Sequence, residues 1–154
     1  MKMQSKAIII ILAILLVLTA VLTVLHLITR EQVPEGALAV HVGEKVSYVD
    51  LASLQTEAVS GTVINGKGEA MEISAQGVEV AELLRTAGVD PAAAGSVTIT
   101  AADEFSAVLT GAEVNEEGKA YLAEDEDGSM KLIVFGDENM KRNVRNVESI
   151  YVES

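Results

Sequence analysis

A run of 19 apolar residues near the N-terminus constrains this chain more than any other feature of its sequence. Residues 7–25 contain no ionisable side chain, and only Thr19 and Thr23 interrupt the aliphatic residues. A hydroxyl at these positions can donate a hydrogen bond to a carbonyl of the preceding helical turn. At about 1.5 Å per residue, such a helix covers roughly the ~30 Å hydrocarbon core of a bilayer. The sequence therefore predicts a transmembrane helix over residues 7–28, within a membrane anchor over residues 1–29.

The charges that flank the apolar run predict its orientation. Lys2, Lys6 and the terminal amine precede it, whereas Arg30 on the other side is followed by Glu31. Because basic residues collect on the cytoplasmic side, we expect a single-pass protein of the cell membrane with its N-terminus in the cytoplasm. The remaining chain then forms an extracytoplasmic domain, and the bilayer itself is a partner through residues 7–28.

A cleaved signal peptide is the alternative interpretation of this segment. Two features favour an uncleaved signal anchor instead. The apolar stretch exceeds the usual signal core of about 7–15 residues. The best small-residue cleavage site, Leu18-Thr19-Ala20, also places a bulky leucine at the third position before the cut.

The rest of the chain is strongly acidic and lacks cysteine. From residue 31 onward there are 23 acidic and 8 basic residues, so this part is repelled by nucleic acid and by anionic lipid. Without cysteine, the chain has no disulfide, thiolate metal site or cysteine nucleophile. Residues 30–36, with Pro34 and Gly36, resemble a short stalk, and residues 37–154 are long enough for one modest domain.

Alternating apolar residues predict several strands in this domain. The pattern favours strands over residues 38–42, 59–64 and 70–74, followed by 97–100, 105–109, 120–123, 132–135 and 150–152. Asn65-Gly66 tolerates the positive φ of a tight turn and joins the second and third of these strands as a hairpin. Residues 132–135 are apolar on both faces, which is typical of a central strand.

Helical signals are few and short. Asp50 can cap a helical turn over residues 51–54. Apolar residues at i, i+3, i+4 and i+7 predict a helix over residues 78–87, and Gly88 supplies the left-handed residue that ends it. Asp90-Pro91 opens a further brief turn. Strands mixed with few helices, and no βαβ rhythm, predict an α+β domain with a small mixed sheet.

The acidic run at residues 124–128 does not have the register of a calcium loop. With Gly128 at the sixth position, the twelfth position is Val134 rather than the glutamate that a calcium loop requires. A solvated turn between two strands is the better interpretation. His26 and His41 have no histidine or aspartate partner at ligand spacing, so the sequence predicts no metal site.

A basic cluster before the last strand is the best candidate site. Lys141, Arg142 and Arg145 are three of the eight basic residues in an acidic domain. In a loop they could hold a phosphate or carboxylate through fork-like hydrogen bonds. The alternative is local neutralisation of Asp137 and Glu138, or of the acidic turn.

A spaced series of motifs over residues 46–152 resembles the oxidoreductase molybdopterin-binding domain of the sulfite-oxidase-like family. The motifs are GVEVAELLRTAGV (77–89), SVTITAADEFS (96–106), YLA (121–123), KLIVFG (131–136) and NMKRNVRNVESIYV (139–152). The resemblance implies a sulfite-oxidase-like fold. It also implies that Arg142 and Arg145 match the family's basic positions, where a pterin phosphate could be held.

Departures from the family pattern weigh against catalysis. In that family a cysteine thiolate ligates molybdenum, and this chain has no cysteine. The cofactor-facing loop is reduced to residues 124–130, and Met140 and Asn146 replace the family's glycine and tryptophan. We therefore expect a non-catalytic binding or accessory module with no cofactor, although molybdopterin is a possible ligand.

Three functions stay open on the sequence alone. The module could bind a small anionic ligand or a neighbouring membrane protein through Lys141, Arg142 and Arg145. Alternatively, it could be a pterin-binding component of a membrane-associated oxidoreductase. It could also be a purely structural surface domain.

Overall fold

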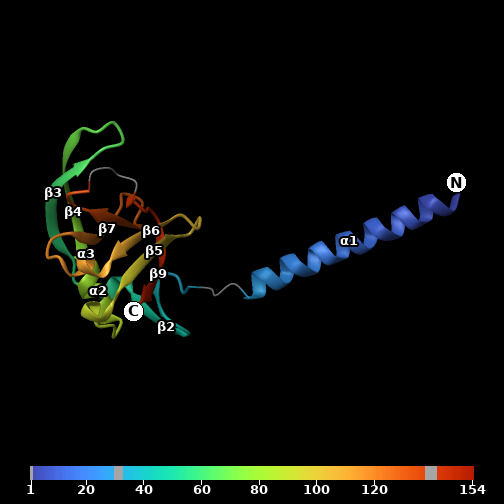
Figure 1. Cartoon of the computed structure of the whole chain (residues 1–154), viewed down its shortest axis with the longest axis horizontal. Helices are drawn as coiled ribbons and strands as arrows, with labels where there is room; N and C mark the ends of the chain where they lie inside the picture. The colour runs from blue at the N-terminus through green and yellow to red at the C-terminus, as the bar shows by residue number, and fades with distance from the viewer. Residues whose placement is uncertain (1, 30–32, 138–141) are drawn as a thin grey trace. The chain divides into compact units, whose positions relative to one another are not determined.

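A computed structural model of the chain describes residues 2–29, 33–137 and 142–154 (Figure 1). The protein divides into two compact units, residues 1–32 and 33–154. The first unit contains one long helix, and the second contains two mixed sheets with short helices. The fold class is α+β, as the sequence predicts.

The first unit is the helix α1 (Lys2–Thr29). From Ser5 to Thr29 it is long and apolar enough to cross a membrane. The hydroxyl groups of Thr19 and Thr23 donate to the carbonyl oxygens of Leu15 and Thr19, each at 2.8 Å. These polar groups are therefore satisfied within the helix, which is the condition for placing them in hydrocarbon.

The second unit contains nine strands in two sheets among its described residues. The five-stranded sheet has the order β2-β1-β9-β5-β6, and the four-stranded sheet has the order β3-β4-β7-β8. Among the strand pairs of the described residues, only β1 and β9 run in parallel. The strands are β1 (Ala37–Val42), β2 (Lys45–Asp50), β3 (Glu57–Ile64), β4 (Ala70–Glu79), β5 (Ser96–Ala101), β6 (Ser106–Thr110), β7 (Ala120–Glu124), β8 (Met130–Val134) and β9 (Val147–Glu153).

Short helical segments connect the strands. The α-helices are α2 (Val80–Thr86) and α3 (Gly111–Asn115), and the 3-10 turns are η1 (Leu51–Ser53) and η2 (Pro91–Ala93). The predicted caps are confirmed, because the Asp50 and Asp90 carboxylates accept from the backbone N–H groups of Ala52 and Ala92 at 3.0 Å. Gly88, with φ of 79°, follows α2 as the sequence predicts.

The main core lies between the two sheets and includes α2. Leu38 of β1, Leu83 of α2, Leu122 of β7, Leu132 of β8 and Ile150 of β9 are fully buried in it. Since these residues come from both sheets and from α2, burial of this cluster ties the unit together.

A second, smaller cluster lies on the opposite face of the four-stranded sheet. Val63, Ala123 and Ile133 are buried there, and Phe135 packs against them. Although β3 and β8 are at opposite ends of this sheet, the Phe135 ring after β8 touches Gly61 of β3. A Cβ atom at Gly61 would be only 2.7 Å from the ring. The sheet therefore curls so that its concave face encloses this cluster.

The prediction that residues 132–135 form a central strand is wrong. β8 pairs with β7 alone and ends the sheet order, and Phe135 falls outside it. β8 is apolar on both faces although it is an edge strand, because Leu132 packs into the main core and Ile133 packs into the second cluster. The Leu132 N–H donates to the Val144 carbonyl at 2.8 Å, so the segment before β9 covers the open edge.

Two further local predictions need correction. The helix begins at Val80 rather than residue 78, because Val78 and Glu79 pair with β7 and extend β4. The predicted hairpin forms, but its positive φ of 81° is at Gly68. The Asn65 side chain instead accepts from the backbone N–H groups of Lys67 and Glu69.

The close approach of Phe135 to Gly61 predicts that this glycine cannot be enlarged. We expect Gly61→Ala to lower the free energy of unfolding by about 1–3 kcal/mol, the usual result of overpacking a core. Gly66→Ala is the matched control, since a Cβ there meets nothing within 4 Å. Denaturant unfolding of both variants measures the difference, and equal stability of the two would contradict the curled arrangement.

Candidate ligand-binding pocket

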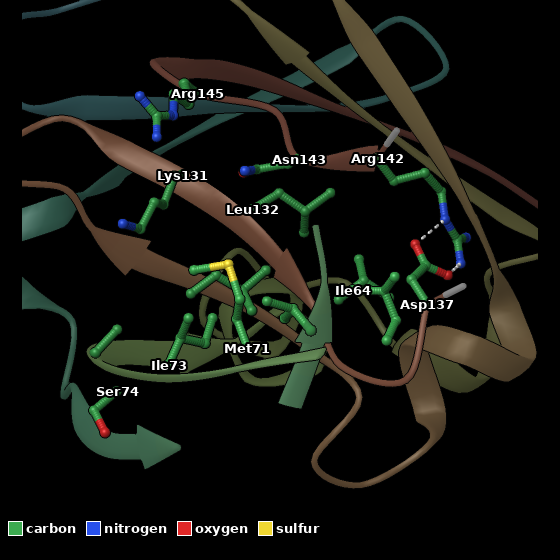
Figure 2. A pocket seen from close by; sticks show the side chains of 14 residues that line it. Ile64, Met71, Ile73, Ser74, Lys131, Leu132, Asp137, Arg142, Asn143 and Arg145 are labelled. Carbon is green, nitrogen blue, oxygen red and sulfur yellow. Dashed lines mark hydrogen bonds and ion pairs between the residues drawn. The ribbon is translucent and has the colours of Figure 1, made fainter. Parts of the chain in front are cut away.

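A pocket of about 330 Å³ lies beside the second cluster, between the β3–β4 hairpin, β8 and the segment before β9 (Figure 2). Its lining is mostly apolar, with polar side chains contributed by Ser74 of β4, by β8 and by the residues between β8 and β9. The lining residues are Val63, Ile64, Met71, Ile73, Ser74, Ala75, Lys131, Leu132, Ile133, Val134, Asp137, Arg142, Asn143 and Arg145.

Charge in the pocket is opposite in sign to that of the whole protein. The chain carries 23 acidic and 11 basic residues. The lining nevertheless contains three basic residues, Lys131, Arg142 and Arg145, against one acidic residue, Asp137. Two of the three are predicted site residues, and the third predicted residue, Lys141, lies outside the described residues.

Arg142 is fully engaged by the protein itself. Its Nε donates to Asp137 at 2.8 Å, and a second nitrogen also donates to that carboxylate (dashed in Figure 2). Its terminal nitrogens donate to the two Glu113 oxygens at 2.9 and 2.7 Å, and to the Val108 carbonyl at 3.3 Å. Arg142 therefore joins the segment before β9 to α3 and to the outer edge of β6.

These contacts shift the pKa values of Glu113 and Arg142, each in the direction that favours its charged form. The hydrogen bonds from Arg142 lower the pKa of Glu113 to about 2, despite opposing desolvation. The hydrogen bonds to Asp137 and Glu113 raise the pKa of Arg142. Binding of a pterin phosphate by Arg142 stays a prediction, and its donors are already in use in this structure.

Glu113 is not among the site residues predicted from the sequence, although a local signal for it is present. Thr110 and Glu113 form a capping box at the start of α3: the Thr110 hydroxyl accepts from the Glu113 N–H at 3.2 Å. The Glu113 carboxylate in turn accepts from the Thr110 N–H at 2.9 Å. The spacing Thr-x-x-Glu is the sequence signature of this arrangement.

Lys131 and Arg145 lie at the other end of the pocket and share one carboxylate. The Lys131 Nζ is 3.0 Å from Asp125, and the Arg145 Nε is 3.9 Å from it. The hydrogen bond from Lys131 lowers the pKa of Asp125. Among the described residues, Asp125 is thus the single carboxylate within ion-pair distance of the two cations Lys131 and Arg145.

Asp125 lies in the acidic segment at residues 124–128 that the sequence predicts to be a turn between two strands, and the structure confirms this turn. The Asp125 N–H donates to the Ser129 carbonyl at 2.7 Å, and Gly128 has a φ of 81°. No group of three potential metal-ligating side chains occurs in the described part of the chain. His41 instead stacks on Tyr151, with ring centroids 4.3 Å apart.

Asn143 lies between the two ends of the pocket (Figure 2). Its Oδ1 is buried and has no hydrogen-bond partner among the residues that the structure describes. The sequence gives no signal for this residue. Its position follows from the bond between Leu132 and Val144, which holds the segment against β8.

The fold is shared with a known oxidoreductase. No model of a known protein family matches this sequence, and no curated protein is significantly similar to it. The chain is similar in structure to the sulfane dehydrogenase SoxCD from Paracoccus pantotrophus, with a TM-score of 0.60 and 15% sequence identity. The match covers 79% of this chain and 39% of that chain. This likeness supports the resemblance inferred from the sequence at the level of the fold.

The donor groups of this chain do not fit a molybdenum centre. In the family that the sequence resembles, the metal is bound by a cysteine thiolate, and the sequence contains no cysteine. Lys131 and Arg145 both contact Asp125, and each keeps further N–H donors that this contact does not use. These two cations are therefore the pocket residues available to a pterin phosphate. The pocket is thus better suited to an organic anion than to a metal.

The Arg142 contacts predict a stability that depends on pH. Arg142→Ala leaves Glu113 and Asp137 without their shared partner, so we expect the free energy of unfolding at pH 7 to fall by about 1–3 kcal/mol. Because the pKa of Glu113 is lowered from 4.5 to about 2, its stabilising effect is present above pH 4.5 and is lost as the pH falls through 2.

Denaturant unfolding of both proteins at several pH values tests this expectation. The difference between wild type and Arg142→Ala should shrink as the pH falls from about 5 towards 2. Arg85→Ala is the control, since it removes an exposed pair with Glu82 and should change stability by less than about 1 kcal/mol. A difference that is the same at every pH would contradict the role of Glu113.

Proposed function

We propose that this protein is a membrane-anchored, extracytoplasmic binding or accessory module that catalyses no reaction itself. The observation that carries this proposal is the pocket on the curled sheet. It concentrates cations in an acidic chain, on a fold also found in a dehydrogenase. Such a pocket suits recognition of a small anionic ligand, or of an anionic group on a neighbouring membrane protein.

The absence of sulfur ligands supports a non-catalytic role. A redox fold of this kind acts through a metal cofactor that the protein orients. This chain keeps the scaffold but supplies no thiolate. Fold likeness alone does not carry function, so the proposal depends on the pocket rather than on the dehydrogenase.

The anchor supports the location. α1 is long and apolar enough to span a bilayer, and its flanking charges favour a cytoplasmic N-terminus. The acidic unit at residues 33–154 is then displayed outside the membrane. A protein so placed can present a captured ligand to membrane proteins beside it.

A second candidate function is a pterin-binding component of a membrane-associated oxidoreductase. The fold likeness to a dehydrogenase favours it, together with Lys131 and Arg145 as donors for a phosphate. In this case the chain would hold the organic part of the cofactor without a protein thiolate on the metal.

Protein purified from its native membrane separates the two functions. We expect molybdenum and pterin well below one per chain, no oxidoreductase turnover, and a ligand-dependent rise in melting temperature. Elemental analysis, absorbance and thermal unfolding measure these quantities. Stoichiometric molybdenum with turnover would contradict the binding module and favour the second candidate.

The orientation in the membrane is testable because the chain has no cysteine. We expect Ser154→Cys to react with a membrane-impermeant maleimide on intact cells. Gln4→Cys, on the other side of the apolar run, should react only after the membrane is opened. The reverse pattern would place the domain in the cytoplasm.

A further inference from the structure

The lining of the pocket separates into an aliphatic part and a polar part. Val63, Met71 and Ile73 of the β3–β4 hairpin line the pocket together with Ile133 of β8. No aromatic side chain is among the lining residues, so a planar ring finds no aromatic face on which to stack. A volume of about 330 Å³ is at the lower end for ligand sites. These features favour a small ligand with an aliphatic body.

The polar part favours one negative charge on the ligand. Arg142 is engaged by Asp137 and Glu113, which leaves Lys131 and Arg145 for a ligand. These two cations share the single carboxylate of Asp125. A ligand carboxylate would balance the remaining charge, whereas a doubly charged phosphate would leave an excess of negative charge in the pocket.

The unpaired Asn143 oxygen favours a hydrogen-bond donor on the same ligand. A buried acceptor without a donor is destabilising and is rare in folded proteins. The Asn143 Oδ1 is such an acceptor, and the residue lines the pocket near Lys131 and Arg145 (Figure 2). An O–H or N–H group of a bound ligand would satisfy it.

We propose that the pocket binds a small aliphatic carboxylic acid that carries a hydroxyl group. The aliphatic body contacts the hairpin and β8, the carboxylate contacts Lys131 and Arg145, and the hydroxyl group donates to the Asn143 Oδ1. This inference rests on the proposed binding function and names the class of ligand. Arg142 acts as a positioning residue, because it holds the segment that carries Asn143 and Arg145.

Calorimetric titration of the full chain in detergent, with a detergent blank, tests the ligand class. The probes are isocaproate, its hydroxy derivative leucic acid, leucine and inorganic phosphate. We expect leucic acid to bind most tightly, isocaproate more weakly because it lacks the hydroxyl donor, leucine more weakly because its ammonium adds a positive charge, and phosphate not at all. Absence of binding by all three acids, or tighter binding of phosphate, overturns the proposal.

Variants test the assigned contacts. Lys131→Ala and Arg145→Ala should each weaken binding of the preferred acid about tenfold, the expected loss of one hydrogen bond to a charged group. Lys67→Ala removes an exposed cation at the hairpin turn and should leave binding unchanged. Equal affinity of the Lys131, Arg145 and Lys67 variants overturns the assignment.

Asn143→Leu separates a ligand contact from a structural role. We expect its melting temperature without ligand to be no lower than that of the wild type, because an unsatisfied acceptor is removed. Its preference for leucic acid over isocaproate should disappear, and Asn143→Ala gives the same comparison if Asn143→Leu does not fold. Survival of the preference overturns the role of Asn143.

The inference and the proposed function fail in different ways. If none of the acids binds a metal-free, inactive protein, the ligand class is wrong and the binding module stands. If the protein holds stoichiometric molybdenum and turns over, the proposed function itself is wrong.

Discussion

The Arg142 guanidinium joins the segment between β8 and β9 to Glu113 of α3 and to Val108 of β6, which lie 29 and 34 residues earlier in the sequence. It contacts Asp137 after β8, Glu113 in α3, and the Val108 carbonyl on the outer edge of β6. Together with the bond from Leu132 to Val144, it fixes the segment that covers the edge of β8. The placement of Asn143 and Arg145 at the pocket depends on these contacts.

The curl of the four-stranded sheet is the second condition for the pocket. Because Gly61 has no side chain, the Phe135 ring packs against β3 from the far end of the sheet. The resulting concave face buries Ile133 in a small cluster, while Leu132 on the other face joins the main core. The pocket is next to this cluster, so its aliphatic character follows from the curl.

Local signals in the sequence predicted much of the fold. The apolar run of α1, the caps at Asp50 and Asp90, and Gly88 after α2 depend on neighbouring residues only. β2 was missed because Val46 and Tyr48 lie on one side of the strand and Val49 on the other, which gives no clear apolar alternation. α3 is too short for a periodic pattern, although its capping box was present.

The sequence by itself determined a helix long and apolar enough to cross a membrane, the α+β class, the acidic charge and the lack of a thiolate, because composition and short-range patterns suffice for these properties. Only the tertiary structure decided which basic residues of the site are bound by carboxylates of the protein and which keep donors for a ligand. Arg142 and Arg145 are three residues apart and both line the pocket, yet Arg142 is held by Glu113 of the distant α3 as well as by the nearby Asp137, whereas Arg145 keeps donors for a ligand. Such long-range pairing depends on how the chain folds back on itself, which spacing along the sequence does not encode.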